Sequence, residues 1–300
     1  MTQFLTTPAE RFAGLPGWHW PSQTWRSDAA TRGAAMAYVD VGPRDARQVF
    51  LCLHGNPTWG YLYRHMIPVF EASGARVVAP DFIGFGRSDK FIDEAAYGFD
   101  FHRGTLLGLI EALDLRRITL AVQDWGGLLG LTLPMAMPDR FERLLIMNTA
   151  LGTGETTEGF RAWRAFSNSR PDLEIGRMLA RSEPRLTPAE AAAYDAPFPD
   201  ARFKAGVRAF PNLVPDGADA PGAALSRQAR QWFREHWRGT SFMAIGMKDP
   251  VLGEAPMLAL REAIPGCPEP LRLAEAGHFA QEHGERIARA ALQAWAAAGR

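Results

Sequence analysis

Residues 120–127 read LAVQDWGG, and this stretch decides the fold. The apolar run that ends at Val122 is typical of a buried strand, and the residues after it are typical of a sharp turn and then a helix. A strand, turn and helix in this order project one side chain, here that of Asp124, above the carboxyl edge of a sheet. A carboxylate is ionised at neutral pH and can attack carbon without a general base. The stretch therefore predicts Asp124 as a nucleophile that forms an ester of the enzyme itself.

Asp124 also has a purely structural interpretation. An Asp between a strand and a helix is most often an N-cap, which accepts hydrogen bonds from the first helical N–H groups. In addition, Val122 stands where the G-x-S-x-G pattern of such turns has its first glycine. Other parts of the chain must decide between the two interpretations.

The composition excludes some classes of function. The chain has 300 residues, with 33 Lys plus Arg and 33 Asp plus Glu, so its net charge is zero. No basic field is therefore available to bind nucleic acid or an anionic membrane. Residues 1–20 lack the basic and apolar regions of a signal peptide, and no segment is apolar for long enough to span a bilayer. We expect a soluble, cytoplasmic monomer without nucleic-acid or membrane partners.

Strand and helix patterns alternate over residues 35–147 and again over residues 241–298. Such alternation predicts an α/β fold, with a mostly parallel sheet covered by helices on both faces. Between these regions the chain contains many prolines, arginines and short helical runs but no strand signal. We therefore predict a core domain formed by residues 1–149 and 239–300, and an inserted helical cap domain formed by residues 150–238. A cap over a sheet creates a roofed pocket for a small ligand.

Two further residues lie where a general base and an acid would assist a nucleophilic carboxylate. Hydrolysis of an enzyme ester requires a histidine base and an acid that orients the imidazole. His278 follows the last predicted strand and Asp249 follows the strand before it, in the chain order nucleophile, acid, histidine that this kind of fold uses. Taken alone, His278 would be a surface residue and Asp249 a turn former before proline. Together, at the carboxyl ends of two strands, they predict a general base and a triad acid.

The stretch HGNP, residues 54–57, follows the second predicted strand. A loop at this place usually supplies one backbone N–H to an oxyanion hole, and the residue after the nucleophile supplies the other. We therefore predict the backbone N–H groups of Asn56 and Trp125 as the oxyanion hole. For His54 we prefer a structural role in bracing the loop.

These stretches together resemble the motifs of haloalkane dehalogenases, which belong to the α/β-hydrolase superfamily. The resemblance is carried by HGNPTW, DFIGFGRSD, VQDWGG, GMKD and AGHF at residues 54–59, 81–89, 122–127, 246–249 and 276–279. It extends over most of the chain and is closest to the branch whose triad acid follows the cap. It implies hydrolysis of carbon–halogen bonds in small apolar haloalkanes to an alcohol, a halide ion and a proton, through an alkyl-aspartate ester. Water is the second substrate, and neither a metal nor a cofactor is implied.

The resemblance also implies a halide site and a pocket. The stretch GFRAW, which ends at Trp163, matches the segment that presents a halide-binding tryptophan, so Trp125 and Trp163 are expected to bind the halide. Another branch of the family uses the Asn of H-G-N-P for this role, which makes Asn56 a further candidate. That branch keeps its triad acid on the strand before the cap, where this chain has Asn148, so Asp249 is favoured. The residues expected to line the pocket are Leu128, Phe160, Phe210, Pro211, Val214 and Leu252.

Epoxide hydrolases are the main alternative, since they also use Asp, His and an acid. They resemble one another in placing tyrosine hydroxyls in the cap to protonate the epoxide oxygen, and only Tyr194 lies in the predicted cap. Fluoroacetate dehalogenases carry an arginine where this chain has Ile83. A non-catalytic binding protein would not need the intact set of Asp124, Asp249 and His278.

Overall fold

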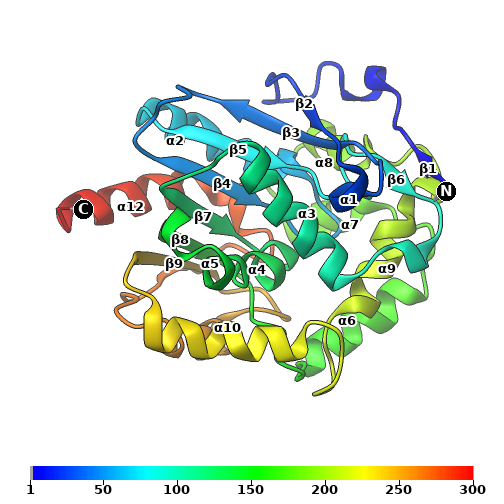
Figure 1. Ribbon diagram of the computed structural model, residues 1–300. Helices are drawn as coiled ribbons and strands as arrows, with labels where there is room; N and C mark the ends of the chain where they lie inside the picture. The colour runs from blue at the N-terminus through cyan, green and yellow to red at the C-terminus, as the bar shows by residue number, and fades with distance from the viewer. Residues whose placement is uncertain (1–2, 300) are drawn as a thin grey trace.

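An eight-stranded sheet runs through the centre of the molecule (Figure 1). The structure, a computed structural model, describes residues 3–299. The strand order is β10-β9-β8-β7-β4-β5-β3-β2, in which the pairs from β10 to β5 are parallel and the last two strands are antiparallel. The strands are β2 (Gln23–Trp25), β3 (Met36–Val41), β4 (Val49–Leu53), β5 (Arg76–Pro80), β7 (Ile118–Val122), β8 (Phe141–Met147), β9 (Thr240–Gly246) and β10 (Leu271–Leu273). The predicted α/β fold with a mostly parallel sheet is confirmed.

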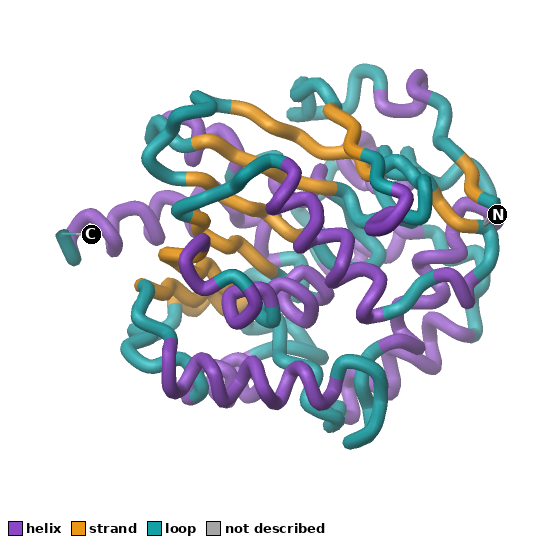
Figure 2. Tube along the Cα trace, viewed as in Figure 1, coloured by secondary structure: helices purple, strands orange, loops and turns teal. Residues whose placement is uncertain are grey.

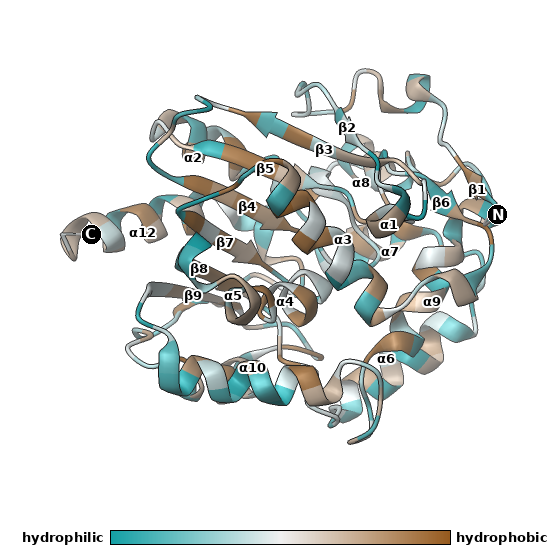
Figure 3. Ribbon diagram, in the orientation of Figure 1, coloured by the Kyte–Doolittle hydropathy of each residue, from teal (hydrophilic) through white to brown (hydrophobic). Residues whose placement is uncertain are grey.

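Helices cover the sheet and explain the apolar character of its strands. Strands β4 and β7 read VFLCL and ITLAV, and all their residues are buried, as expected for parallel strands covered on both faces. Figure 3 shows the central strands largely in brown, the colour of hydrophobic residues. Helix α3 lies in front of the sheet in Figure 1 and α12 lies behind it. The covering helices are α1 (Asp28–Thr31), α2 (Ile67–Ala72), α3 (Phe99–Ala112), α4 (Trp125–Gly130), α5 (Leu133–Ala136), α11 (Glu254–Glu262) and α12 (Gly284–Ala297).

Between β8 and β9 the chain leaves the sheet, and the fully described stretch 148–239 contains no strand. Helix α8 begins with a capping box between Thr187 and Glu190, with Pro188 at its first position. Helix α6 packs against α9 and α7 against α8, whereas α10 packs against α5 beside the sheet (Figures 1 and 2). The bounds are α6 (Glu158–Asn168), α7 (Ile175–Ser182), α8 (Pro188–Asp195), α9 (Ala205–Leu213) and α10 (Ala223–His236). The stretch predicted as a cap therefore includes four helices that pack in pairs and one that joins the layer over the sheet.

A second, two-stranded sheet pairs β1 (Phe4–Leu5) with β6 (Lys90–Phe91) in antiparallel fashion. Helix α9 contacts β6, which connects the helices after β8 to this small sheet. Over residues 3–299, no helix is both long enough and apolar enough to cross a lipid bilayer.

Candidate active site

Asp124 occupies a strained turn between β7 and α4. Its φ is 50° and its ψ is −124°, a conformation that residues other than glycine rarely adopt. Gly126 and Gly127 let α4 lie close to the strands. A Cβ at these positions would lie 2.0 Å from the carbonyl oxygen of Leu53 and 1.9 Å from Oγ1 of Thr149. Asp124 is the N-cap residue of α4 through its backbone carbonyl, which accepts hydrogen bonds from the N–H groups of Gly127 and Leu128. Among the residues that the structure describes, its side chain makes no capping hydrogen bond, so the carboxylate does not act as the cap.

The Asp124 carboxylate instead faces two residues that were expected to act with it. Its Oδ1 accepts a hydrogen bond from the backbone N–H of Asn56 at 2.8 Å, and its Oδ2 lies 3.6 Å from Nε2 of His278. The side chains of Asp124 and His278 are 16% and 17% exposed, so a small molecule can reach them while bulk water is largely excluded. Trp125, the other predicted oxyanion donor, begins α4 directly after Asp124.

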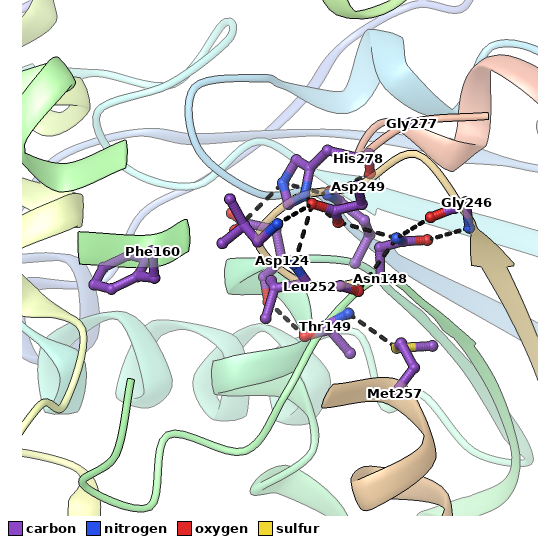
Figure 4. Close-up of polar contacts among 12 residues, drawn as sticks. Asp124, Asn148, Thr149, Phe160, Gly246, Asp249, Leu252, Met257, Gly277 and His278 are labelled. Carbon is purple, nitrogen blue, oxygen red and sulfur yellow. Dashed lines mark hydrogen bonds and ion pairs between the residues drawn. The ribbon is translucent and has the colours of Figure 1, made fainter. Parts of the chain in front are cut away.

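His278 is held in place by Asp249. The Nδ1–H group of His278 donates a hydrogen bond to Oδ2 of Asp249 at 2.7 Å (Figure 4). Oδ1 of Asp249 accepts hydrogen bonds from the backbone N–H groups of Val251 and Leu252 at 2.8 and 3.1 Å. Burial alone would raise the pKa of Asp249, but the charge of His278 and these donors lower the pKa below its ordinary value. Asp249 is therefore an anion that fixes the orientation and tautomer of the imidazole.

The charge of His278 depends on the groups on both sides of its ring. Burial lowers the pKa of the imidazole, but Asp249 and Asp124 outweigh this effect and raise the pKa to about 10. Gln123 has the opposite effect on the charge of His278. Its amide nitrogen lies 2.9 Å from Nε2 of His278 and donates to the His278 carbonyl oxygen at 3.1 Å. A donor at Nε2 favours the neutral ring with its proton on Nδ1. Gln123 therefore opposes the effect of the two carboxylates.

Asn148 connects Asp249 to the sheet. Its Nδ2 donates to Oδ2 of Asp249 at 2.9 Å, and its Oδ1 accepts a hydrogen bond from the backbone N–H of Gly246 at 2.8 Å (Figure 4). Asn148 and Gln123 are both fully buried. Sequence reasoning missed the two contacts, because it treated Asn148 only as a position without a carboxylate and Gln123 only as part of a motif. The signal for Asn148 was its place at the carboxyl end of β8, beside the end of β9.

Two cavities meet at Asp124. One has a volume of about 450 Å³ and the other of about 170 Å³, and both have Asp124 and Phe160 in their walls. The larger cavity is mainly apolar, and its walls include the expected pocket residues Leu128, Val214 and Leu252. The walls of the smaller cavity include Asn56, Trp163, Asp249 and His278. Asp124 therefore borders both cavities.

Three residues expected at the site lie outside the walls of both cavities: Trp125, Phe210 and Pro211. Phe210 is fully buried because α9 turns its ring against Trp125, with 4.6 Å between the ring centroids. Oδ1 of Asn56 is buried and has no hydrogen-bond partner within residues 3–299. In the same part of the chain, no group of three or more His, Cys, Asp or Glu side chains is placed to hold a metal ion.

Comparison with known proteins agrees with this geometry. Residues 48–285 match the family described as the alpha/beta hydrolase fold. The haloalkane dehalogenase of Psychrobacter cryohalolentis is 40% identical over 97% of this chain and 97% of its own length. That of Mycobacterium marinum is 42% identical over 93% of this chain and 94% of its own.

The chain belongs to the haloalkane dehalogenase family. Among solved structures, the haloalkane dehalogenase DpaA of Paraglaciecola agarilytica NO2, a tetramer, is 47% identical. Its TM-score is 0.95, and the match covers 97% of this chain and 98% of that one. The similarity to haloalkane dehalogenases thus includes the helices between β8 and β9 as well as the sheet.

Proposed function

We propose that this chain hydrolyses the carbon–halogen bond of small haloalkanes through a covalent ester on Asp124. Its membership of the haloalkane dehalogenase family makes it a hydrolase that acts on carbon–halide bonds. One observation carries the assignment of residues. The Asp124 carboxylate opens on two cavities, while one of its oxygens is held by Asn56 and the other faces His278. The partners of the reaction are a small apolar haloalkane, water and the released halide ion.

We assign the attack to Oδ2 of Asp124. Oδ1 already accepts the Asn56 N–H, so it becomes the carbonyl oxygen of the ester. Oδ2 forms a bond to the carbon that carries the halogen, the carbon–halogen bond breaks, and the halide leaves with the bonding electron pair. Alkylation removes the negative charge of Asp124. It thereby removes part of the attraction that raises the pKa of His278, and the imidazole becomes neutral more easily.

His278 then acts as the general base for hydrolysis. Its neutral ring takes a proton from water, and the water oxygen attacks the carbonyl carbon of the ester. Negative charge develops on Oδ1, which already accepts the backbone N–H of Asn56. We propose this N–H and that of Trp125 as the oxyanion hole. The alcohol leaves with the proton from His278. Asp124 returns to its ionised form, so one proton is released in each turnover.

The proposed halide site consists of the indole N–H groups of Trp125 and Trp163, with the Asn56 side chain as a further candidate. An indole donates a hydrogen bond but accepts none, so it favours an anion without bringing in a positive charge. Trp163 and Asn56 share the wall of the smaller cavity with Asp124. Trp163 comes from α6, and Met178 of α7 lies in the same wall, which supports the proposal that helices within residues 150–238 act as a cap over the site.

Epoxide hydrolysis is less well supported by the arrangement of tyrosines. The Tyr194 hydroxyl, which would have to protonate an epoxide oxygen, donates a hydrogen bond to Glu282 and lies 3.2 Å from a guanidinium nitrogen of Arg64. The residue is fully buried. This hydroxyl is therefore engaged in a buried ionic network rather than available to a substrate at Asp124.

A paired substrate assay tests the proposed function. We expect the purified protein to release bromide from 1-bromobutane and to leave styrene oxide unchanged. The Asp124→Asn variant keeps the shape of the side chain but loses the nucleophilic charge, and it should release no bromide. Turnover of styrene oxide without bromide release from the haloalkane would contradict the proposal.

A further inference from the structure

Glu183 brings a buried carboxylate to the loop that carries the histidine. It lies directly after α7, and its side chain is about 2% exposed. Oε1 of Glu183 accepts a hydrogen bond from the backbone N–H of Gly277 at 3.0 Å. Gly277 immediately precedes His278. The contact thus joins residues separated by 94 positions in the sequence, one beside the histidine and the other at the end of a helix in the predicted cap.

The surroundings of this contact fit a role in positioning. A Cβ at residue 277 would lie 3.0 Å from Oε1 of Glu183, so glycine at this position permits the close approach. On the same helix, Met178 and Ser182 line the smaller cavity together with His278. Helix α7 therefore forms part of the wall around the site and also holds the backbone beside the histidine.

The charge of Glu183 is weakly compensated. Within residues 3–299, Nε2 of His283 lies 3.8 Å from Oε2 of Glu183, which is an ion pair only when His283 is protonated, and burial lowers the pKa of His283. Glu282, Arg185 and His278 also act on the carboxylate from the neighbouring segments. Burial is the largest effect and raises the pKa of Glu183 to about 7. A buried carboxylate without an arginine or lysine partner is an unfavourable way to hold a loop, and a neutral amide could make the same hydrogen bond. The negative charge of Glu183 is therefore expected to have a functional role.

We propose that Glu183 is a positioning residue for the hydrolytic step. Its hydrogen bond to the Gly277 amide fixes the position of His278 relative to α7. The inference rests on the proposed function, because it takes His278 as the base that cleaves the ester. Glu183 touches neither the substrate nor the reacting atoms, so attack by Asp124 should not depend on it. A charged acceptor binds the Gly277 N–H more strongly than a neutral one. The hold on His278 therefore weakens when Glu183 is protonated.

Single-turnover kinetics with 1-bromobutane separates the two steps. Halide release reports alkylation, and the decay of the alkyl-enzyme mass reports hydrolysis. Glu183→Gln keeps an acceptor for Gly277 but removes the charge, so it should resemble the protonated wild type at every pH. We expect ester decay in this variant to match the wild type at about pH 6 and to be about fivefold slower at about pH 8.5. Alkylation should be unchanged at both pH values.

Two further variants complete the test. Glu183→Ala removes the acceptor and should slow ester decay about 10- to 100-fold at both pH values, with alkylation within about twofold of the wild type. Glu174→Gln is the matched control, because Glu174 lies at the start of the same helix but is 67% exposed and paired with Arg177. Its loss should change neither step, since exposed ion pairs contribute little.

The possible outcomes separate the inference from the proposed function. Equal ester decay in Glu183→Gln and the wild type at every pH would overturn the inference, and so would a slower decay that does not depend on pH. Slowed alkylation would mean that Glu183 supports the site as a whole, which also contradicts the inference. If the wild-type protein releases halide without passing through an alkyl-enzyme, the proposed function itself fails.

Discussion

Asp249 and Asp124 lie on opposite sides of the His278 ring and act on it differently. Oδ2 of Asp249 is 2.7 Å from Nδ1, a hydrogen bond, whereas Oδ2 of Asp124 is 3.6 Å from Nε2, an ionic contact without a good hydrogen bond. Asp249 keeps its charge throughout the proposed cycle, while Asp124 loses its charge on alkylation. The same histidine can therefore be protonated in the resting enzyme and neutral when the ester must be hydrolysed.

The contacts of Asp249 lead to a prediction that compares variants of Asp249 and Asn148. Asp249→Asn should lower kcat by about 10⁴-fold, because the amide cannot hold the Nδ1–H tautomer of His278. Asn148→Ala removes one donor to Asp249 and should have a much milder effect, about tenfold. Steady-state bromide release measures both variants, and circular dichroism checks that they are folded. Equal losses at the two positions would mean that the acid has been assigned to the wrong strand.

The raised pKa of His278 also predicts how stability changes with pH. The folded-state pKa of about 10 exceeds the ordinary value of about 6.5, so protonated His278 stabilises the fold fully below about pH 6.5. This contribution is lost as the pH rises to about 10. In Asp124→Asn one of the two attracting charges is absent, so the loss should be smaller. Urea unfolding at several pH values tests this, and an identical pH dependence for the two proteins would contradict it.

At the scale of secondary structure, the turn from β7 into α4 depends on how closely the helix approaches the sheet. Asp124 has a positive φ, and the two glycines after Trp125 have no room for a side chain. Asp124 could be predicted as a nucleophile from the sequence because a short strand, a turn and small residues are encoded locally. It did not reveal the contact from Glu183 to Gly277 or that from Asn148 to Asp249, because these depend on how distant elements meet.

Replacing Gly127 tests the packing of α4. In Gly127→Ala the new methyl group would lie 1.9 Å from Oγ1 of Thr149, so α4 must move. We expect the free energy of unfolding to fall by about 1–3 kcal/mol and activity to fall with it. The matched control is Gly104→Ala in α3, where nothing lies within 4 Å of the new Cβ. This variant should be neutral or more stable by up to about 1 kcal/mol. Similar thermal denaturation of the two variants would contradict the account of the turn.

For the whole molecule, the structure agrees most closely with the prediction from the sequence in the central sheet. The central strands β4 and β7 are short, fully buried apolar runs. The ends of the predicted strands allowed Asp124, Asp249 and His278 to be placed at the carboxyl edge before any contact was known. The helices between β8 and β9 were less predictable, since their orientation depends on packing. Phe210 was expected in a pocket wall and instead packs against Trp125, because α9 faces the core there.

The oligomeric state is a prediction for the whole molecule. We expect a monomer, because among residues 3–299 Phe4 and Ile92 are the large hydrophobic residues exposed by more than a third, and they form no extended apolar surface. DpaA, at 47% identity, is a tetramer. Light scattering coupled to size-exclusion chromatography should give the mass of one chain. A mass of four chains would contradict the expectation and indicate an assembly like that of DpaA.

Trapping the ester tests the central claim most directly. In His278→Phe the nucleophile is intact but the base is absent, so alkylation of Asp124 should proceed and hydrolysis should stop. Mixed with 1-bromobutane, this variant should release about one bromide per active site and then gain the mass of a butyl group. Peptide mapping should place the added mass on Asp124. If the wild type is active but the variant carries no adduct, or carries it on another residue, covalent catalysis through Asp124 is wrong.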